Sequence, residues 1–104
     1  MRTPQEVERG IAAPDTLGLE TRVEIRKAAI QLLEQMPEGT GRLVIDLSRT
    51  RHIDSAGLGA LMLIQRRAAE RRQDVVLRNP SEEIRFLLTL TKLYDLFQVE
   101  AGED

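Results

Sequence analysis

The chain has 104 residues, of which 41% are hydrophobic and 31% charged, and its net charge at neutral pH is -2. This length predicts one domain, and the hydrophobic fraction is too high for a disordered chain. The absence of cysteine and the single histidine exclude disulfides, thiol catalysis and the common zinc and multi-histidine sites. We therefore expect a single domain over residues 1–104 that uses no metal or cofactor.

The chain shows no targeting or membrane signal. There is no run of about 18 apolar residues, so no transmembrane helix is expected. Residues 1–10 are charged and lack the apolar stretch of a signal peptide. The slightly acidic balance also disfavours general nucleic-acid binding. These features predict a soluble cytoplasmic protein without nucleic acid or membrane insertion.

The first third of the chain predicts a poor strand followed by a long helix. Residues 1–16 are weakly patterned, and at most one short strand, around 7–13, fits there as an irregular arm or edge strand weakened by Gly10. Apolar residues recur at helical spacing over 18–36, and Pro37 ends that helix.

The rest of the chain alternates short apolar runs with helical segments. Short branched runs of this kind are typical of buried parallel strands. Ser81 is expected to cap the last helix, with Glu82 and Glu83 in its first turn. Strands are predicted at 43–45, 74–78 and 96–100, a turn at 48–53, and helices over 55–71 and after Ser81. This alternation predicts an α/β fold with a parallel or mixed sheet and helices packed on it.

Both long helices carry apolar residues on the face that should be polar. Leu63 lies in the middle of the polar face of helix 55–71, beside Gly59 and Ala60, while Val23 and Ile30 lie among charged residues of the first helix. Single exposed apolar residues are normal and need no explanation. Alternatively, these residues form a docking surface on which small side chains allow close approach.

The opposite face of helix 55–71 is expected to meet the sheet. Its members are apolar: Leu58, Leu61, Met62, Ala68 and Ala69. The polar face carries arginines, including Arg66 and Arg67, which most simply form a solvated surface rather than a nucleic-acid site.

The segment 53–59, Ile-Asp-Ser-Ala-Gly-Leu-Gly, is the most informative stretch. Asp54 or Ser55 can cap the helix that follows, and glycines allow close packing against the sheet. The same geometry suits a switch, because a phosphate on Ser55 would be tolerated at a helix N-terminus yet add about -1.5 to -2 charges beside Asp54. Catalysis by Ser55 is disfavoured because His52, in the same loop, is the only candidate imidazole base.

This segment and its context resemble the STAS domains of bacterial anti-sigma-factor antagonists. The resemblance covers roughly residues 17–100 and rests on four stretches: Ile-Asp-Leu-Ser at 45–48, Asp-Ser-Ala-Gly-Leu-Gly at 54–59, Arg66-Arg67 and Asn-Pro-Ser at 79–81. It implies a STAS fold, with a four- or five-stranded, mixed but largely parallel sheet and three to four helices mainly on one face.

The resemblance also implies a mechanism. In this family the serine at the position of Ser55 is phosphorylated by a partner serine kinase that is also the anti-sigma factor. The unphosphorylated form binds that kinase and frees the sigma factor, and a phosphatase resets the serine. Asp54 matches the acidic residue beside the phosphorylation site, and the switch loop is Asp54, Ala56 and Gly57. From the helix faces described above, the partner is expected at Leu58, Gly59, Ala60 and Leu63, with Val23 and Ile30 on the first helix.

Alternatives and departures from the family remain. The domain could be an unphosphorylated accessory or scaffold subunit, in a stress-signalling assembly or beside the ATPase of a lipid transporter. An enzyme is disfavoured, and an oligomer is possible. Many relatives have two strands before the first helix, where one is expected here, and the exposed edge could be covered by the arm 1–9 or by another subunit. Lys92 stands where relatives often carry glycine, which predicts a left-handed backbone there.

Overall fold

A computed structural model describes residues 7–101 of the chain. Four parallel strands form one sheet in the order β1-β3-β5-β6, and two further strands, β2 and β4, pair with each other in parallel. The elements in chain order are β1 (Glu8–Ala12), β2 (Thr16–Leu17), α1 (Arg22–Gln35), β3 (Arg42–Asp46), β4 (His52–Ile53), α2 (Ser55–Glu70), β5 (Asp74–Arg78), α3 (Glu82–Leu90), the 3-10 turn η1 (Tyr94–Leu96) and β6 (Gln98–Glu100).

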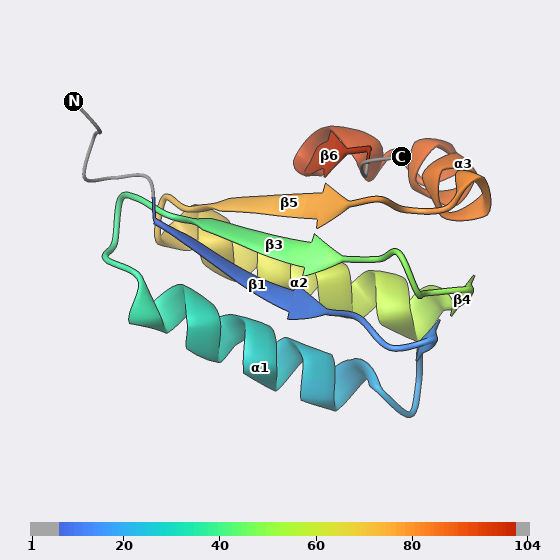
Figure 1. The fold of residues 1–104 in the computed structure, drawn as a ribbon, viewed down its shortest axis with the longest axis horizontal. Helices are drawn as coiled ribbons and strands as arrows, with labels where there is room; N and C mark the ends of the chain where they lie inside the picture. Colours follow the sequence, from blue (N-terminus) through green and yellow to red (C-terminus); the bar gives the residue numbers. More distant parts are fainter. Residues whose placement is uncertain (1–6, 102–104) are drawn as a thin grey trace.

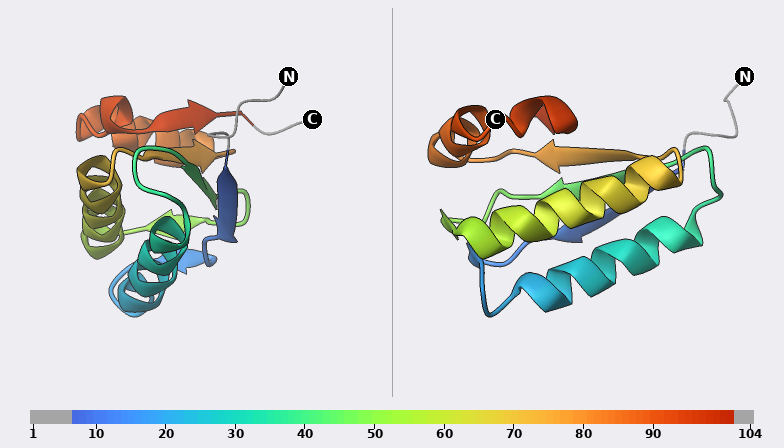
Figure 2. Two further views of the ribbon diagram at one scale, coloured as in Figure 1. Left: turned by 90° about the vertical axis from the view of Figure 1, so that its left-hand side faces the viewer. Right: turned by 180° about the vertical axis from the view of Figure 1, so that it is seen from behind.

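The predicted α/β fold is confirmed, with all four strands of the sheet parallel rather than mixed. Helices α1 and α2 run side by side across one face of the sheet, and α3 lies beyond the carboxyl end of β5 (Figures 1 and 2). The two helices begin at the same end of the molecule, because each follows a strand and returns antiparallel to it (Figure 2). The Ser55 end of α2 therefore lies beside the first turn of α1.

The N-terminal region differs from the expectation of a single strand. The expected strand is present as β1, but the short strand β2 follows it and pairs with β4, which ends the predicted turn at 48–53. Each of these strands has only two residues, too few to show an alternating pattern in the sequence. The suggested covering arm, residues 1–9, falls mostly outside the described part of the chain.

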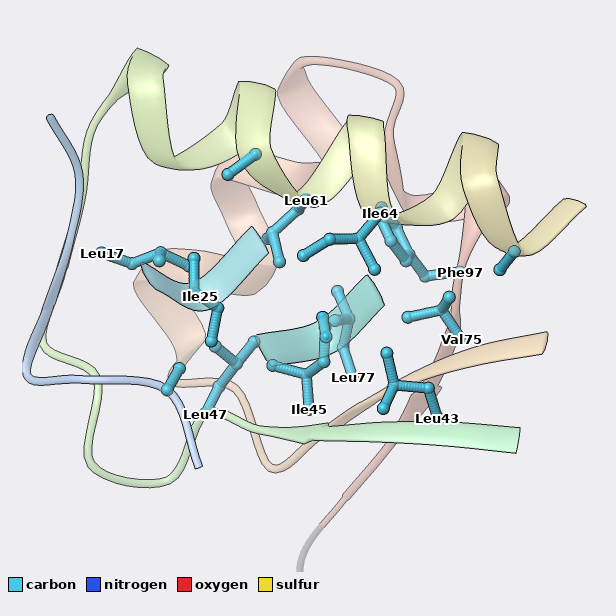
Figure 3. Packing of buried hydrophobic residues seen from close by; sticks show 14 of the residues in the cluster. Leu17, Ile25, Leu43, Ile45, Leu47, Leu61, Ile64, Val75, Leu77 and Phe97 are labelled. Carbon is cyan, nitrogen blue, oxygen red and sulfur yellow. The ribbon is translucent and has the colours of Figure 1, made fainter. Parts of the chain in front are cut away.

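The core lies between the sheet and the two long helices (Figure 3). Alternate residues of β3 and β5 point into it, so these strands bury Leu43, Ile45, Val75 and Leu77 against α1 and α2. The side chains between them, Val44 and Val76, are also buried, although they do not belong to this cluster. Both faces of the central strands are thus shielded, which explains their continuous apolar character.

The end of α1 is fixed to the turn after α2. Gln73 is buried, and its amide Nε2 donates to the carbonyl oxygens of Leu33, Met36 and Pro37 at 3.1–3.2 Å. Arg71 adds a 2.8 Å hydrogen bond from Nη2 to the Met36 carbonyl. These bonds satisfy carbonyl groups that a helix leaves unpaired at its C-terminus, and they hold α1 and α2 together at this end.

Candidate functional site

The loop before α2 is organised by the carboxylate of Asp54. Its Oδ1 accepts a 2.9 Å hydrogen bond from the Gly57 N–H, which makes Asp54 the N-cap of α2, and its Oδ2 accepts one from the Leu19 N–H at 3.2 Å. The Gly57 N–H, supported by the Leu19 and Ala56 N–H groups and the charge of Arg22, lowers the pKa of Asp54. The ionised carboxylate therefore ties the start of α2 to the loop before α1.

Ser55 is the first residue of α2, and its side chain is exposed. The sequence left the cap to either Asp54 or Ser55, and the structure assigns it to Asp54. Within residues 7–101 the Ser55 hydroxyl has no hydrogen-bond partner. Ser55 therefore performs no capping role, and its hydroxyl is open to a modifying enzyme.

Two glycines allow this loop to pack closely. Gly57 is buried, and a Cβ atom there would clash with the backbone carbonyl of Leu17 in β2. A Cβ on Gly18 would likewise clash with the Asp54 carboxylate. The expected close packing is confirmed for Gly57, although its neighbour is β2 rather than the main sheet.

The candidate partner-binding residues are not all on the surface. Leu63 and Val23 are exposed at 45% and 43%, and Ile30 is half-buried. Leu58 and Ala60, by contrast, are only 9% and 4% exposed and belong to the hydrophobic core, so a partner would meet little of their side chains.

Gly59 lies on the outer side of α2, where a Cβ atom would have no neighbour within 4 Å. It lines a hollow of about 390 Å³ between the first turns of α1 and α2. The hollow is also lined by Arg22, Arg26, Ser55 and Leu63. The structure thus brings Ser55, Gly59 and Leu63 together around one surface depression.

Two residues expected to meet the sheet do not. Met62 is 44% exposed and lines the same hollow, and Ala69 is exposed. At 100° per residue both lie just beyond Leu58, which ends the buried arc of α2, and therefore on its solvent side. Leu19, which the sequence analysis did not select, is 63% exposed beside Asp54. Only the contact between residues 35 positions apart reveals that it belongs to this site.

Other site types find no support in the described part of the chain. Among residues 7–101 no group of three or more histidine, aspartate or glutamate side chains is placed to hold a metal ion. No helix in this range is long and apolar enough to cross a membrane. Asp46 accepts a 2.9 Å hydrogen bond from the Ser48 N–H and so stabilises the turn after β3.

Comparison with known proteins agrees with the fold. The family model described as "Mlab, STAS domain" matches residues 12–98, and the chain therefore belongs to the STAS domain family. A STAS-domain-containing protein of Pseudomonas aeruginosa (strain UCBPP-PA14) is 33% identical over 58 residues, a match that spans 56% of this chain and 57% of that relative. The chain thus matches little more than half the length of this relative.

Three solved structures share the fold. A candidate anti-sigma factor antagonist from Thermotoga maritima has a TM-score of 0.72 and 23% identity, covering 89% of this chain and 80% of that one. A sulfate transporter family protein from Wolinella succinogenes gives 0.67 and 16%, covering 96% and 80%. The unphosphorylated anti-sigma factor antagonist SpoIIAA gives 0.65 and 19%, covering 100% and 86%.

Proposed function

We propose that this STAS domain is an anti-sigma-factor antagonist whose partner docks beside Ser55 and is released when Ser55 is phosphorylated. The observation that carries the proposal is the division of roles at the start of α2. Asp54 caps the helix, and Ser55 presents a free hydroxyl next to an open hollow. A residue with no structural duty at such a position is well placed to be a switch.

The physical consequence of phosphorylation follows from this position. A phosphate at the first residue of α2 gains from the helix dipole, so the fold would tolerate it. It would nevertheless add about -1.5 to -2 charges beside the ionised Asp54, at the rim of the hollow. A protein packed over Gly59 and Leu63 would meet both bulk and repulsion, and it would be released without unfolding of the domain.

In this proposal the docked partner is the anti-sigma factor, a serine kinase that phosphorylates Ser55, and a cognate phosphatase restores the free hydroxyl. The likeness of the fold to two anti-sigma factor antagonists supports this assignment. The protein acts in the cytoplasm as an interaction module and not as an enzyme.

A second candidate is an accessory subunit that works without phosphorylation, for example beside the ATPase of a lipid transporter or in a stress-signalling scaffold. It is favoured by the likeness of the fold to a sulfate transporter family protein. In that case the same surface would hold its partner permanently. Both Ser55→Ala and Ser55→Asp would then bind as the wild type does.

The test is capture of partners from a lysate of the native source with wild type, Ser55→Ala and Ser55→Asp as parallel baits. A serine kinase held by wild type and Ser55→Ala and lost by Ser55→Asp is the expected result. Ser48→Asp is the matched control, because Ser48 is also an exposed serine close to a turn but lies outside the hollow. Retention of the same partner by all four baits would refute the switch.

The free energy of unfolding tests whether Ser55 also has a structural role in the fold. Because Ser55 does not cap α2, Ser55→Ala is expected to change the free energy of unfolding by less than about 0.5 kcal/mol. A loss of about 1 kcal/mol, typical of a lost cap, would show that the hydroxyl has a structural duty after all.

A further inference from the structure

The hollow beside Ser55 is one end of a longer groove. A second hollow of about 390 Å³ adjoins it, sharing Arg26 and Leu63 and adding Ile30, Arg66, Arg67 and Glu70. Together they form the α1–α2 groove, which follows the line where the two helices lie side by side (Figure 2). Gly59, Ile30 and Leu63 give it a partly apolar floor, and arginines stand along its sides.

The arginines of the groove differ in whether they have partners. Arg67 lies 3.6 Å from Glu34 and 3.7 Å from Glu70, so carboxylates balance it at the far end. Within residues 7–101 the side chains of Arg26 and Arg66 form neither an ion pair nor a hydrogen bond. The groove therefore holds two unpaired arginine side chains, although the net charge of the chain is -2.

The groove is also held in shape before anything binds. At one end Asp54 joins the start of α2 to Leu19, and at the other end Gln73 holds the last carbonyl groups of α1. A site whose walls are already fixed loses little conformational entropy when it is filled.

We propose that the α1–α2 groove binds an acidic amphipathic helix of the partner protein. This inference rests on the proposed function, in which the partner docks at this end of the molecule. The apolar residues of such a helix would pack on Leu63 and Ile30, and its carboxylates would pair with Arg26 and Arg66. Charge complementarity of this kind selects a partner and speeds its association. Helix α1, with 14 residues, sets the length of the occupant at about 14 residues, or about 21 Å.

Nucleic acid fits the groove less well. Its partly apolar floor suits the leucines of an amphipathic helix, whereas a nucleic-acid backbone offers phosphates and sugars and no apolar side chains to cover Ile30 and Leu63. A second copy of this chain could offer α3, where Glu82 and Glu83 precede the exposed Phe86. That occupant would make the protein self-associate, so the experiment below includes it as an outcome.

The probe is a synthetic peptide of about 14 residues, with leucines at i, i+3 and i+7, a glutamate beside each leucine and alanine, the best helix former, at the remaining positions. A peptide in which every glutamate is replaced by lysine is its control. Binding is followed by NMR through the methyl groups of Ile30 and Leu63 in the full-length protein. We expect the acidic peptide to shift both methyl signals, more weakly as salt is added, and the lysine peptide to shift neither.

Charge reversal locates the site. Arg26→Glu and Arg66→Glu are each expected to weaken the acidic peptide at least about tenfold, because an attraction becomes a repulsion. Arg9→Glu is the matched control, since Arg9 is exposed on β1 and has no ion pair within the described residues. Equal binding of both peptides, unchanged affinity in both groove variants, or methyl signals that stay in place would overturn the proposal. So would self-association that Phe86→Ser abolishes, or binding of a DNA duplex that competes with the peptide.

The same assay separates this inference from the switch. If groove variants lose the peptide and Ser55→Asp binds it normally, the acidic helix stands and the switch falls. If Ser55→Asp loses the natural partner while groove variants keep it, the switch stands and the acidic helix falls.

Discussion

The two arginine-bearing surfaces of this domain differ in whether their charges are already neutralised. On the open face of the sheet, Arg42 lies 2.7 Å from Glu100, and Arg78 lies 3.1 Å from Glu100 and 3.9 Å from Glu8. In the α1–α2 groove, Arg26 has no carboxylate partner within residues 7–101. On the sheet face both arginines are paired within the domain, whereas in the groove Arg67 is paired and Arg26 and Arg66 could form ion pairs only with another molecule.

The reason for the difference lies in what each surface covers. Val44 and Val76 lie on the open face of β3 and β5 and are at most 2% exposed, although no helix covers them. The stems of Arg42 and Arg78 extend from the same face of the same strands, and long arginine stems shield apolar surface while their charged ends remain in water. Pairing with Glu100 keeps these stems in place. Arg26 and Arg66 in the groove have no such pairing within residues 7–101, so their side chains are available for binding.

The largest effect expected separates the structural side of α2 from the groove side. Gly57→Ala places a methyl group against the backbone carbonyl of Leu17. Only a movement of the backbone can relieve this clash, because no side chain can move out of the way. We expect a loss of about 1–3 kcal/mol or more in the free energy of unfolding, measured by urea denaturation. An unchanged unfolding midpoint would mean that β2 does not press against α2, and the tight packing of the loop would be wrong.

On the open sheet face, removing Glu100 should destabilise the protein in a pH-dependent way. Hydrogen bonds from Arg78 and Arg42 lower the pKa of Glu100 in the folded state. This stabilisation is therefore fully present above the ordinary pKa of a glutamate and is lost as the pH falls through the lowered pKa of the folded state. Glu100→Gln should have a lower Tm at pH 7 and a flatter decline in acid than the wild type.

Glu38→Gln is the control for this measurement, because Glu38 is exposed and forms no ion pair among the described residues. If Glu100→Gln and Glu38→Gln have the same Tm from pH 7 down to pH 3, the pairing on the sheet face contributes nothing. The contrast between the two arginine surfaces would then lose its physical basis.

Lys92 tests a backbone feature that the sequence predicted. The residue after α3 and its cap has φ of 62°, and the N–H groups of Lys92 and Leu93 donate to the carbonyls of Thr89 and Leu88 at 3.1 and 2.9 Å. The left-handed backbone expected at Lys92 is confirmed. Lys92→Gly should stabilise the protein by about 1 kcal/mol.

The control is Lys92→Ala, which also removes the lysine side chain but keeps the strain of a Cβ atom at positive φ. Differential scanning calorimetry should show a higher Tm for the glycine variant than for the alanine variant. Equal values for the two would mean that the backbone strain at this position is negligible.

Patterns within one element were enough to predict much of this molecule. The apolar runs of β3 and β5, the helical spacing in α1 and α2, and the cap of α3 all lie within short windows of sequence. The Ser81 cap is confirmed by a 3.1 Å hydrogen bond from the Ile84 N–H to Oγ. The same local patterns also placed Leu63 and Val23 correctly on the surface.

Features that depend on contacts between distant residues were not predicted. The pairing of β2 with β4, the bond from Leu19 to Asp54 and the exposure of Met62 all depend on how elements meet in space. The sequence could not decide whether Asp54 or Ser55 caps α2, because that depends on whether the helix begins at residue 55 or one residue later. That single residue converts Ser55 from a structural serine into a candidate switch.

The smallest expected gain in stability tests the groove itself. Glycine inside a helix is less stable than alanine, and a Cβ on Gly59 would meet open space, so Gly59→Ala should raise the free energy of unfolding by about 0.5–1 kcal/mol. The added methyl would nevertheless stand in the groove between Ser55 and Leu63, where a partner needs to approach closely. We expect this variant to be more stable than the wild type and to bind the acidic peptide more weakly.

Higher stability with unchanged binding would show that Gly59 is not needed for close approach, and the occupied part of the groove would then lie nearer Ile30 and Arg66. Gly57→Ala, two residues away, should instead lower the free energy of unfolding. The two variants therefore report separately on the packed side and the groove side of one helix.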